Sequence, residues 1–149
     1  MTVLRNPWLI VGGWLSVGAS LLHIACIFGG AAWYRYLGAG EKMAQMAERG
    51  EWFPPVVTLA IAVVLAIWAA YAFAGAGLIG RLPLMRTALI TISAIYLVRG
   101  LSLFPTLALR PQGVTSLGIW SSLIVLCYGV FYAVGTWKAW PYLSMKEAR

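Results

Sequence analysis

The sequence predicts an all-α membrane protein, a bundle of four transmembrane helices with a short amphipathic interfacial helix in the first loop. Apolar residues make up 62% of the 149 residues and charged residues only 10%. Soluble domains contain about 45–50% apolar and about 25% charged residues. Four apolar runs each approach the roughly 20 residues that cross a hydrocarbon core. A soluble fold of this length could not bury so much apolar surface, whereas lipid can cover it.

The chain is predicted to form one membrane domain, residues 1–149, with spans at about 8–28, 54–79, 87–107 and 117–137. The links 80–86 and 108–116 are short, and Pro83 and Pro111 break helical structure between spans. The second, third and fourth helices are therefore expected to be antiparallel neighbours. Residues 29–53 form the long connection.

The first run begins after Arg5, as a signal peptide would. However, Gly12 and Gly13 interrupt its apolar stretch, and the run is longer than the 7–15 apolar residues of a signal peptide. We therefore expect the first span to be retained in the mature protein.

The long connection contains a predicted amphipathic helix from Glu41 to Arg49. Met43, Met46 and Ala47 share one helical face, and Gly50 can end the helix. Such a helix can lie in the headgroup plane with its apolar face down. The alternative interpretation is a lid over a pocket that opens outward.

The distribution of basic residues predicts the orientation. The net charge is +7, from eleven Lys and Arg against four Glu. One side of the membrane would carry Arg5, Arg81, Arg86, Lys138, Lys146 and Arg149, and the other Arg35, Lys42, Arg49 and Arg110. This excess predicts a multi-pass protein of the bacterial inner (cytoplasmic) membrane with both termini in the cytoplasm. Membrane lipids are the expected partners, and the absence of a basic run interleaved with aromatic residues argues against nucleic acid.

Small residues are expected to mark the helix contacts, because lipid gives helices no hydrophobic reason to associate. The predicted packing residues are Ala62, Ala66, Ala70 and Ala74 in the second span and Gly12 and Ser16 in the first. The alanine row could pack within the bundle, or join copies of the chain in a homo-oligomer or a larger membrane complex.

Arg99 lies near the middle of the third span, where a cation costs about 2.5–3.5 kcal/mol on insertion scales. No Asp or Glu occurs in any predicted span. Arg99 either bonds carbonyls and tyrosines and locks the bundle, or its guanidinium binds an anionic or quinone-like amphiphile. The candidate ligand-binding residues are Arg99, His23, Tyr128, Tyr132 and Glu51.

Other chemistry has little support in the sequence. Metal sites need clusters of His, Cys or carboxylates, and the chain has one His. Cys26 and Cys127 are predicted to differ in depth by ~12 Å, which is beyond disulfide reach. We expect no catalytic residue, metal or cofactor. The leading interpretation is a non-enzymatic accessory or lipid-interacting bundle; a site-bearing binding protein or enzyme is the alternative, and a small transporter ranks third.

Two stretches carry a resemblance, GGAAWYRYLGAGEKMAQMAERGEWFPPVVT and RLPLMRTALITISAIYLVRG. They are similar to small four-span membrane proteins of Gram-negative bacteria, over residues from about Gly29 to Gly100. The resemblance implies a four-span fold and no particular activity. The layout is also similar to that of DoxX-like proteins, in the number of spans alone.

Overall fold

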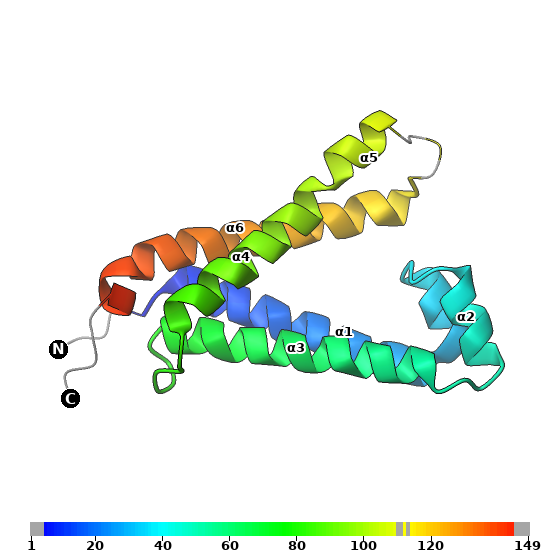
Figure 1. The fold of residues 1–149 in the computed structure, drawn as a ribbon, viewed down its shortest axis with the longest axis horizontal. Coiled ribbons are helices and arrows are strands. Elements are labelled where there is room, and N and C mark those ends of the chain that lie inside the picture. The colour runs from blue at the N-terminus through cyan, green and yellow to red at the C-terminus, as the bar shows by residue number, and fades with distance from the viewer. Residues whose placement is uncertain (1–4, 110–111, 113, 145–149) are drawn as a thin grey trace. The chain divides into compact units, whose positions relative to one another are not determined.

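The computed structural model describes residues 5–109, 112 and 114–144, whose regular secondary structure is helical, with no strand among them. The helices are α1 (Pro7–Tyr36), α2 (Glu41–Glu48), α3 (Phe53–Gly75), α4 (Met85–Leu101), α5 (Leu103–Leu109) and α6 (Ser116–Ser144) (Figure 1). Among the described residues, four helical segments are long and apolar enough to cross a membrane: α1, α3, α4 together with α5, and α6. The predicted all-α, four-span fold class is confirmed. Arg110, Lys146 and Arg149, used above for orientation, lie outside the described residues.

The described residues form two compact units. The first unit comprises residues 5–15 and the described residues from Trp68 onward, and the second comprises Ser16–Ile67. Helices α1 and α3 therefore contribute to both units, α2 belongs to the second, and α4, α5 and α6 belong to the first.

Helix α1 is longer than the predicted span 8–28 and is kinked near its end. Asn6 caps its start, because the Asn6 side-chain oxygen accepts from the backbone N–H of Trp8 at 3.2 Å. The kink is at Gly30, whose φ of 63° and ψ of −151° are open to glycine and strained for other residues. The predicted loop 29–53 is thus largely helical, since it holds the last turns of α1 and all of α2.

Helix α3 ends before the predicted boundary at residue 79. The N–H of Gly77 donates to the Ala74 carbonyl at 3.1 Å, and the N–H of Leu78 donates to the Phe73 carbonyl at 2.9 Å. With Gly77 at a φ of 74°, these two bonds form a Schellman motif that closes the helix. Helix α6, in contrast, continues past the predicted end at residue 137.

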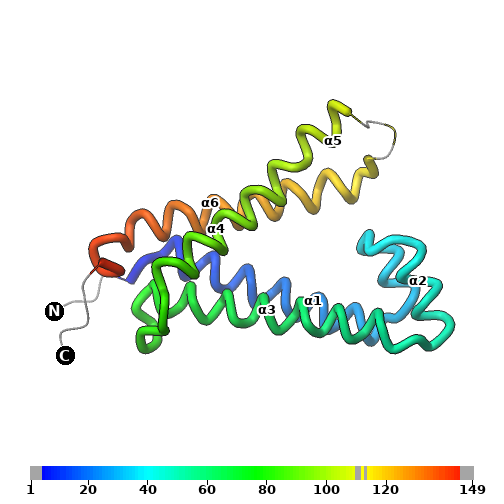
Figure 2. The backbone as a smooth tube through the Cα atoms, viewed as in Figure 1, coloured from blue at the N-terminus to red at the C-terminus, as the bar shows by residue number. Residues whose placement is uncertain are grey.

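The third span was predicted as one helix over residues 87–107, and it is instead interrupted at Ser102. The cause is Pro105, which has no N–H to donate to the Leu101 carbonyl and whose ring clashes with that carbonyl in a regular helix. Figure 2 traces the backbone from α4 through this interruption into α5. The break exposes polar backbone groups of α4, and the hydroxyl of Ser102 donates to one of them, the Arg99 carbonyl, at 2.7 Å.

Close approach of α4 and α6 holds the first unit together. A Cβ atom added at Gly100 would lie 2.6 Å from the Leu126 Cα, and one at Gly129 would lie 2.9 Å from the Leu97 backbone nitrogen. Glycine at both places lets the two backbones touch, as expected for helices in lipid. The predicted packing residue Gly12 belongs to the same unit, and its added Cβ would lie 3.0 Å from the Tyr132 ring.

Polar and small side chains join α1 to α3 within the second unit. The Ser20 hydroxyl donates to the Ala62 carbonyl at 2.7 Å, and Ala62 and Ser16 are fully buried or nearly so. The predicted row does not form one buried face, however: Ala66 is exposed and Ala70 is half-buried, while Ala74 is buried. Residues spaced by four rotate about 40° per step around a helix of 3.6 residues per turn, so the row drifts off one face.

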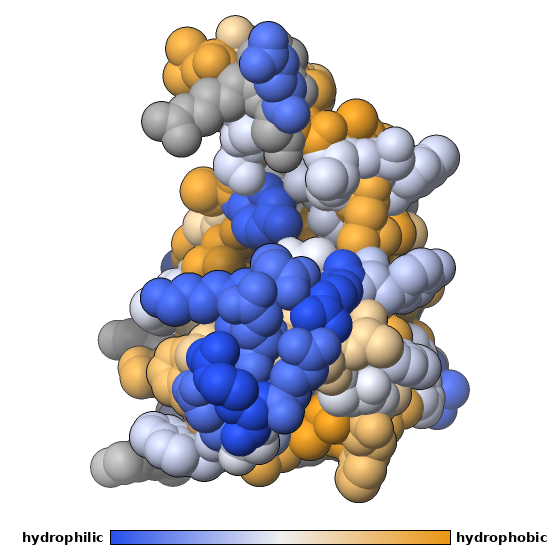
Figure 3. Space-filling model, turned by 90° about the vertical axis from the view of Figure 1, so that its right-hand side faces the viewer, coloured by the Kyte–Doolittle hydropathy of each residue, from blue (hydrophilic) through white to orange (hydrophobic). Residues whose placement is uncertain are grey.

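The short helix α2 was predicted from Glu41 to Arg49 and is found at Glu41–Glu48. Its buried residue is Ala44, which packs with Cys26 and Tyr34 of α1. Hydrophilic side chains gather over α2 on the face shown in Figure 3. The apolar side of α2 thus contacts the last turns of α1, and whether α2 also rests on lipid or covers a pocket stays a prediction.

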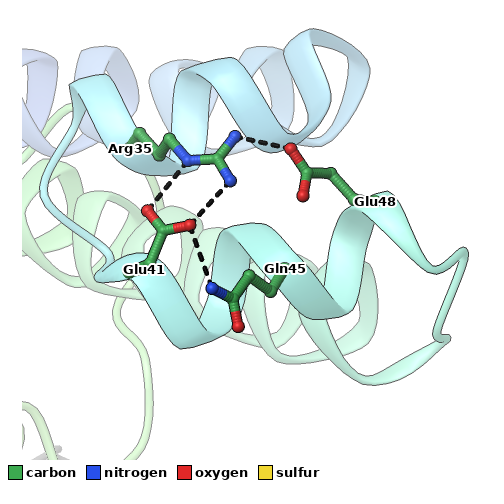
Figure 4. Close-up of polar contacts among 4 residues, drawn as sticks. All are labelled: Arg35, Glu41, Gln45 and Glu48. Atoms are coloured by element: carbon green, nitrogen blue, oxygen red, sulfur yellow. Dashed lines mark hydrogen bonds and ion pairs between the residues drawn. The ribbon is translucent and has the colours of Figure 1, made fainter.

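An ion-pair network fastens α2 to α1 (Figure 4). The Arg35 guanidinium donates to Glu41 Oε1 at 2.7 Å and to Glu48 Oε1 at 2.7 Å. These hydrogen bonds from Arg35 lower the pKa of both carboxyl groups below their usual value of 4.5. The carboxylates therefore contribute to the docking of α2 above about pH 4.5.

Acid is accordingly expected to loosen α2. As the pH falls through the lowered pKa values of Glu41 and Glu48, protonation removes the charges that Arg35 holds. Hydrogen exchange of the α2 amides, corrected for the intrinsic effect of pH, should show protection that is constant above pH 4.5 and falls below it. The Arg35→Gln variant should show weaker protection with no such fall, and an identical profile in both proteins would contradict the prediction.

Candidate functional site

A hollow of about 260 Å³ lies within the first unit, beside the break between α4 and α5. Helices α4 and α5 form one wall, and the start of α6 with the residues before it forms the other. Its lining residues are Arg99, Ser102, Leu103, Thr106, Val114, Thr115, Gly118 and Ser122. A cation and several hydroxyl groups therefore meet at membrane depth, in a segment that hydropathy marks as spanning.

Among the described residues, Arg99 is the one charged side chain that lines the hollow. It lies 14 residues after Met85, which is ~21 Å along the span at 1.5 Å per residue. Its Nη1 donates to the Ser122 hydroxyl oxygen at 3.1 Å, and within the described part of the chain this is its side-chain hydrogen bond. The guanidinium has five N–H donors, so most of its donor capacity is unused by these residues.

The described residues of the first unit offer Arg99 no carboxylate. Among the four Glu of the sequence, Glu41, Glu48 and Glu51 belong to the second unit, and Glu147 lies outside the described residues. The ion pairs of the described residues likewise join α1, α2 and the residues after α2. The described lining of the hollow therefore carries the positive charge of Arg99 and no negative charge.

Hydrogen-bond directions show which hydroxyl groups can still donate. The Ser102 and Thr106 hydroxyls donate to backbone carbonyls at 2.7 Å each, so their protons are in use. The Ser122 oxygen accepts from Arg99, and the Thr115 oxygen accepts from the Gly118 N–H at 3.1 Å. The protons of Ser122 and Thr115 thus remain available to an acceptor in the hollow.

The start of α6 adds further donors. Thr115 is the N-cap, since its side chain accepts from the N–H three residues on. The N–H groups of Ser116 and Leu117, in the first turn, have no partner within a helix, and the N-terminal end of a 29-residue helix carries partial positive charge. The Arg99 cation, the two hydroxyl protons and the N-terminus of α6 would all favour an anion in this hollow.

The other predicted site residues do not line this hollow. His23 belongs to the second unit, where its Nδ1–H donates to the Ala19 carbonyl at 2.7 Å. That bond satisfies the Nδ1 side of the imidazole within α1 itself. Glu51 also belongs to the second unit, and its carboxylate accepts from Arg49 Nε at 2.6 Å. A pairing of Arg99 with His23 or Glu51 stays a prediction.

Tyr128 and Tyr132 belong to the first unit and join a cluster of aromatic rings. The Tyr96 ring centroid lies 5.5 Å from that of Tyr128 and 5.3 Å from that of Tyr132. The Tyr132 hydroxyl donates to the Trp68 carbonyl at 3.1 Å. Tyr132 thus joins α6 to α3, whereas Arg99 donates its hydrogen bond to Ser122, elsewhere on α6.

Sequence reasoning missed Ser122, the partner of Arg99. One signal was available, because Ser122, Gly129 and Thr136 are spaced by seven and all three are buried. Small residues at this spacing mark one helix face. Among the described residues no group of three or more His, Cys, Asp or Glu side chains is placed to hold a metal ion.

No protein-family model, curated protein or solved structure matches the chain.

Proposed function

We propose that this multi-pass membrane protein binds the anionic headgroup of an amphiphile in the hollow beside Arg99, without catalysing a reaction. The observation that carries the proposal is a cation in a hollow of about 260 Å³, hydrogen-bonded to Ser122 and facing no carboxylate among the described residues of its unit. A guanidinium at membrane depth is costly unless it finds partners or water. An anion would supply the acceptors that the described residues of the first unit lack.

The chemistry of the hollow favours a phosphate or carboxylate over a neutral quinone. Among the described residues, the available donors are the remaining N–H groups of Arg99, the Ser122 and Thr115 hydroxyls, and the first N–H groups of α6. Donors of this kind can surround an anion with several oxygens, and Arg matches phosphate and carboxylate oxygens two at a time. The apolar Leu103 and Val114 in the lining suit the first carbons of an alkyl chain.

The proposed location is the bacterial inner membrane, with both termini in the cytoplasm. Support comes from the basic residues at one end of the first unit, Arg5, Arg81, Arg86 and Lys138, because cytoplasmic ends carry more Lys and Arg. In this orientation the hollow opens in the outer half of the membrane. A C-terminal alkaline phosphatase fusion should be inactive, and an active fusion would overturn the assignment.

Binding of dodecyl phosphate tests the site. The purified protein in a non-ionic detergent should bind this probe, and Arg99→Gln should bind it about ten- to a hundredfold more weakly, since a hydrogen bond to a charged group contributes about 1.5–3 kcal/mol. Lys42→Gln is the matched control, because it removes the same charge from α2 and should leave affinity unchanged. Equal affinity in the Arg99→Gln variant would contradict the proposal.

Inorganic phosphate distinguishes the two sources of such an anion. If the ligand is an amphiphile, dodecyl phosphate should bind far more tightly than inorganic phosphate, because the alkyl chain is buried as well. If both probes bind equally and both need Arg99, the hollow takes a free anion and the amphiphile part of the proposal is wrong.

A further inference from the structure

A second set of cations lies at the end of the first unit formed by residues 81–86 and the last turns of α6. The Arg86 Cζ lies 4.4 Å from the centroid of the Trp140 ring, and the Lys138 Nζ lies 5.6 Å from that of Trp8. Cations stacked on rings in this way are attracted by the negative face of the aromatic system. No carboxylate belongs to the described residues of this unit.

Arg81 fixes the geometry of this end. Its Nη2 donates to the Tyr142 carbonyl at 2.9 Å, and its Cζ lies 4.8 Å from the Tyr142 ring centroid. The Tyr142 carbonyl is among the last four of α6, which have no partner within the helix. Arg81 thus caps α6 and ties the segment before α4 to the segment that carries Trp140.

Arg86 is in a different position from Arg81. Its side chain is exposed, and its contact among the described residues is the face of the Trp140 ring. Stacking occupies the flat face of a guanidinium and leaves its N–H groups free, because these point outward in the plane. Trp140 is itself partly exposed, as interfacial tryptophans are.

We propose that Arg86, held over Trp140, binds the phosphate of an anionic bilayer lipid at this end of the protein, with Lys138 over Trp8 as a weaker second contact. A guanidinium fork matches two phosphate oxygens, whereas the Lys138 ammonium is a point charge. The ring keeps the fork at the depth of the headgroups. This site is separate from the hollow beside Arg99 and does not rest on the function proposed for it.

The test is lipid binding by the full chain in a non-ionic detergent, in the Arg99→Gln background so that the first hollow does not contribute. Dilauroyl phosphatidylglycerol and dilauroyl phosphatidylcholine are titrated, and native mass spectrometry gives the apparent dissociation constants. Phosphatidylglycerol should bind more tightly than phosphatidylcholine. Arg86→Gln should weaken the binding of phosphatidylglycerol about fivefold, the effect of one cation near an anionic lipid. Lys42→Gln removes an equal charge elsewhere and should have no effect.

Two further variants separate recognition from charge and from folding. Arg86→Lys retains the charge but loses the fork of the guanidinium. Its affinity for phosphatidylglycerol should therefore lie between that of the parent and that of Arg86→Gln. Trp140→Leu retains every charge and should also weaken the binding of phosphatidylglycerol, because the Trp140 ring no longer holds the Arg86 guanidinium in place. The proposal is overturned if Arg86→Gln and Lys42→Gln behave alike, or if the two lipids bind equally to the parent.

Discussion

Replacing Gly100 with valine is expected to separate α4 from α6 and to give the largest loss of stability of any change considered for this chain. A Cβ at Gly100 would lie 2.6 Å from the Leu126 Cα and 2.7 Å from its backbone nitrogen, so no side-chain rotation can relieve the contact. Overpacking in a well-packed core costs about 1–3 kcal/mol, and a clash with backbone falls at or above the upper end. Unfolding in detergent, followed by circular dichroism, measures the loss.

Gly18 supplies the matched control for this change. It lies in α1, its position is helical, and an added Cβ would have nothing within 4 Å. The unfolding midpoint of Gly18→Val should therefore be nearly the same as that of the parent. An equal loss of stability in the two variants would contradict this explanation. It would mean that valine destabilises any helix of this protein, and that the close contact of α4 with α6 is not the cause.

Replacing Gly30 with alanine should undock α2. The φ of 63° and ψ of −151° at Gly30 are open to glycine, and other residues held there cost about 1–3 kcal/mol. Relief of this strain straightens α1 and withdraws Tyr34 from its contact with Ala44. Cys26, which is 5% exposed in the same cluster, should then become accessible.

Thiol labelling by N-ethylmaleimide follows this opening, in a Cys127→Ser background because Cys127 is exposed. Labelling of Cys26 should be about ten- to a hundredfold faster in Gly30→Ala than in the parent, in line with strain of this size. Gly18→Ala is the control and should label at the parental rate. An unchanged rate in Gly30→Ala would show that the kink does not hold α2 in place.

The spans could be predicted from hydropathy, because lipid requires each crossing segment to be long, apolar and helical. The ends and interruptions of the helices were harder to predict, because they depend on single residues within otherwise helical, apolar sequence. Pro105 lies inside an apolar run yet breaks α4 from α5, and Gly30 allows a kink where helical residues continue on both sides. Pro83 was recognised as a helix breaker because it lies in a short link between spans, whereas Pro105 was overlooked because it lies within a span; Pro111 lies outside the described residues.

Arg99 could be singled out as a candidate from its depth alone, but its partner could not. Ser122 lies opposite Arg99 because Gly100 and Gly129 set how closely and in which register α4 meets α6. Register between helices is a property of packing that a single sequence does not display. For the same reason Tyr128 and Tyr132 were grouped with Arg99, although the Tyr128 ring contacts Tyr96 and the Tyr132 hydroxyl donates to the Trp68 carbonyl.

The measurement that tests the central claim most directly is the native mass spectrum of the parent and of Arg99→Gln, mildly solubilised from their membrane with nothing added. An anionic amphiphile held beside Arg99 predicts a discrete additional mass on the parent that is absent from the variant, while Lys42→Gln retains it. An additional mass that both the parent and Arg99→Gln retain, or no additional mass on either, would contradict the claim and leave Arg99 as a structural bond to Ser122.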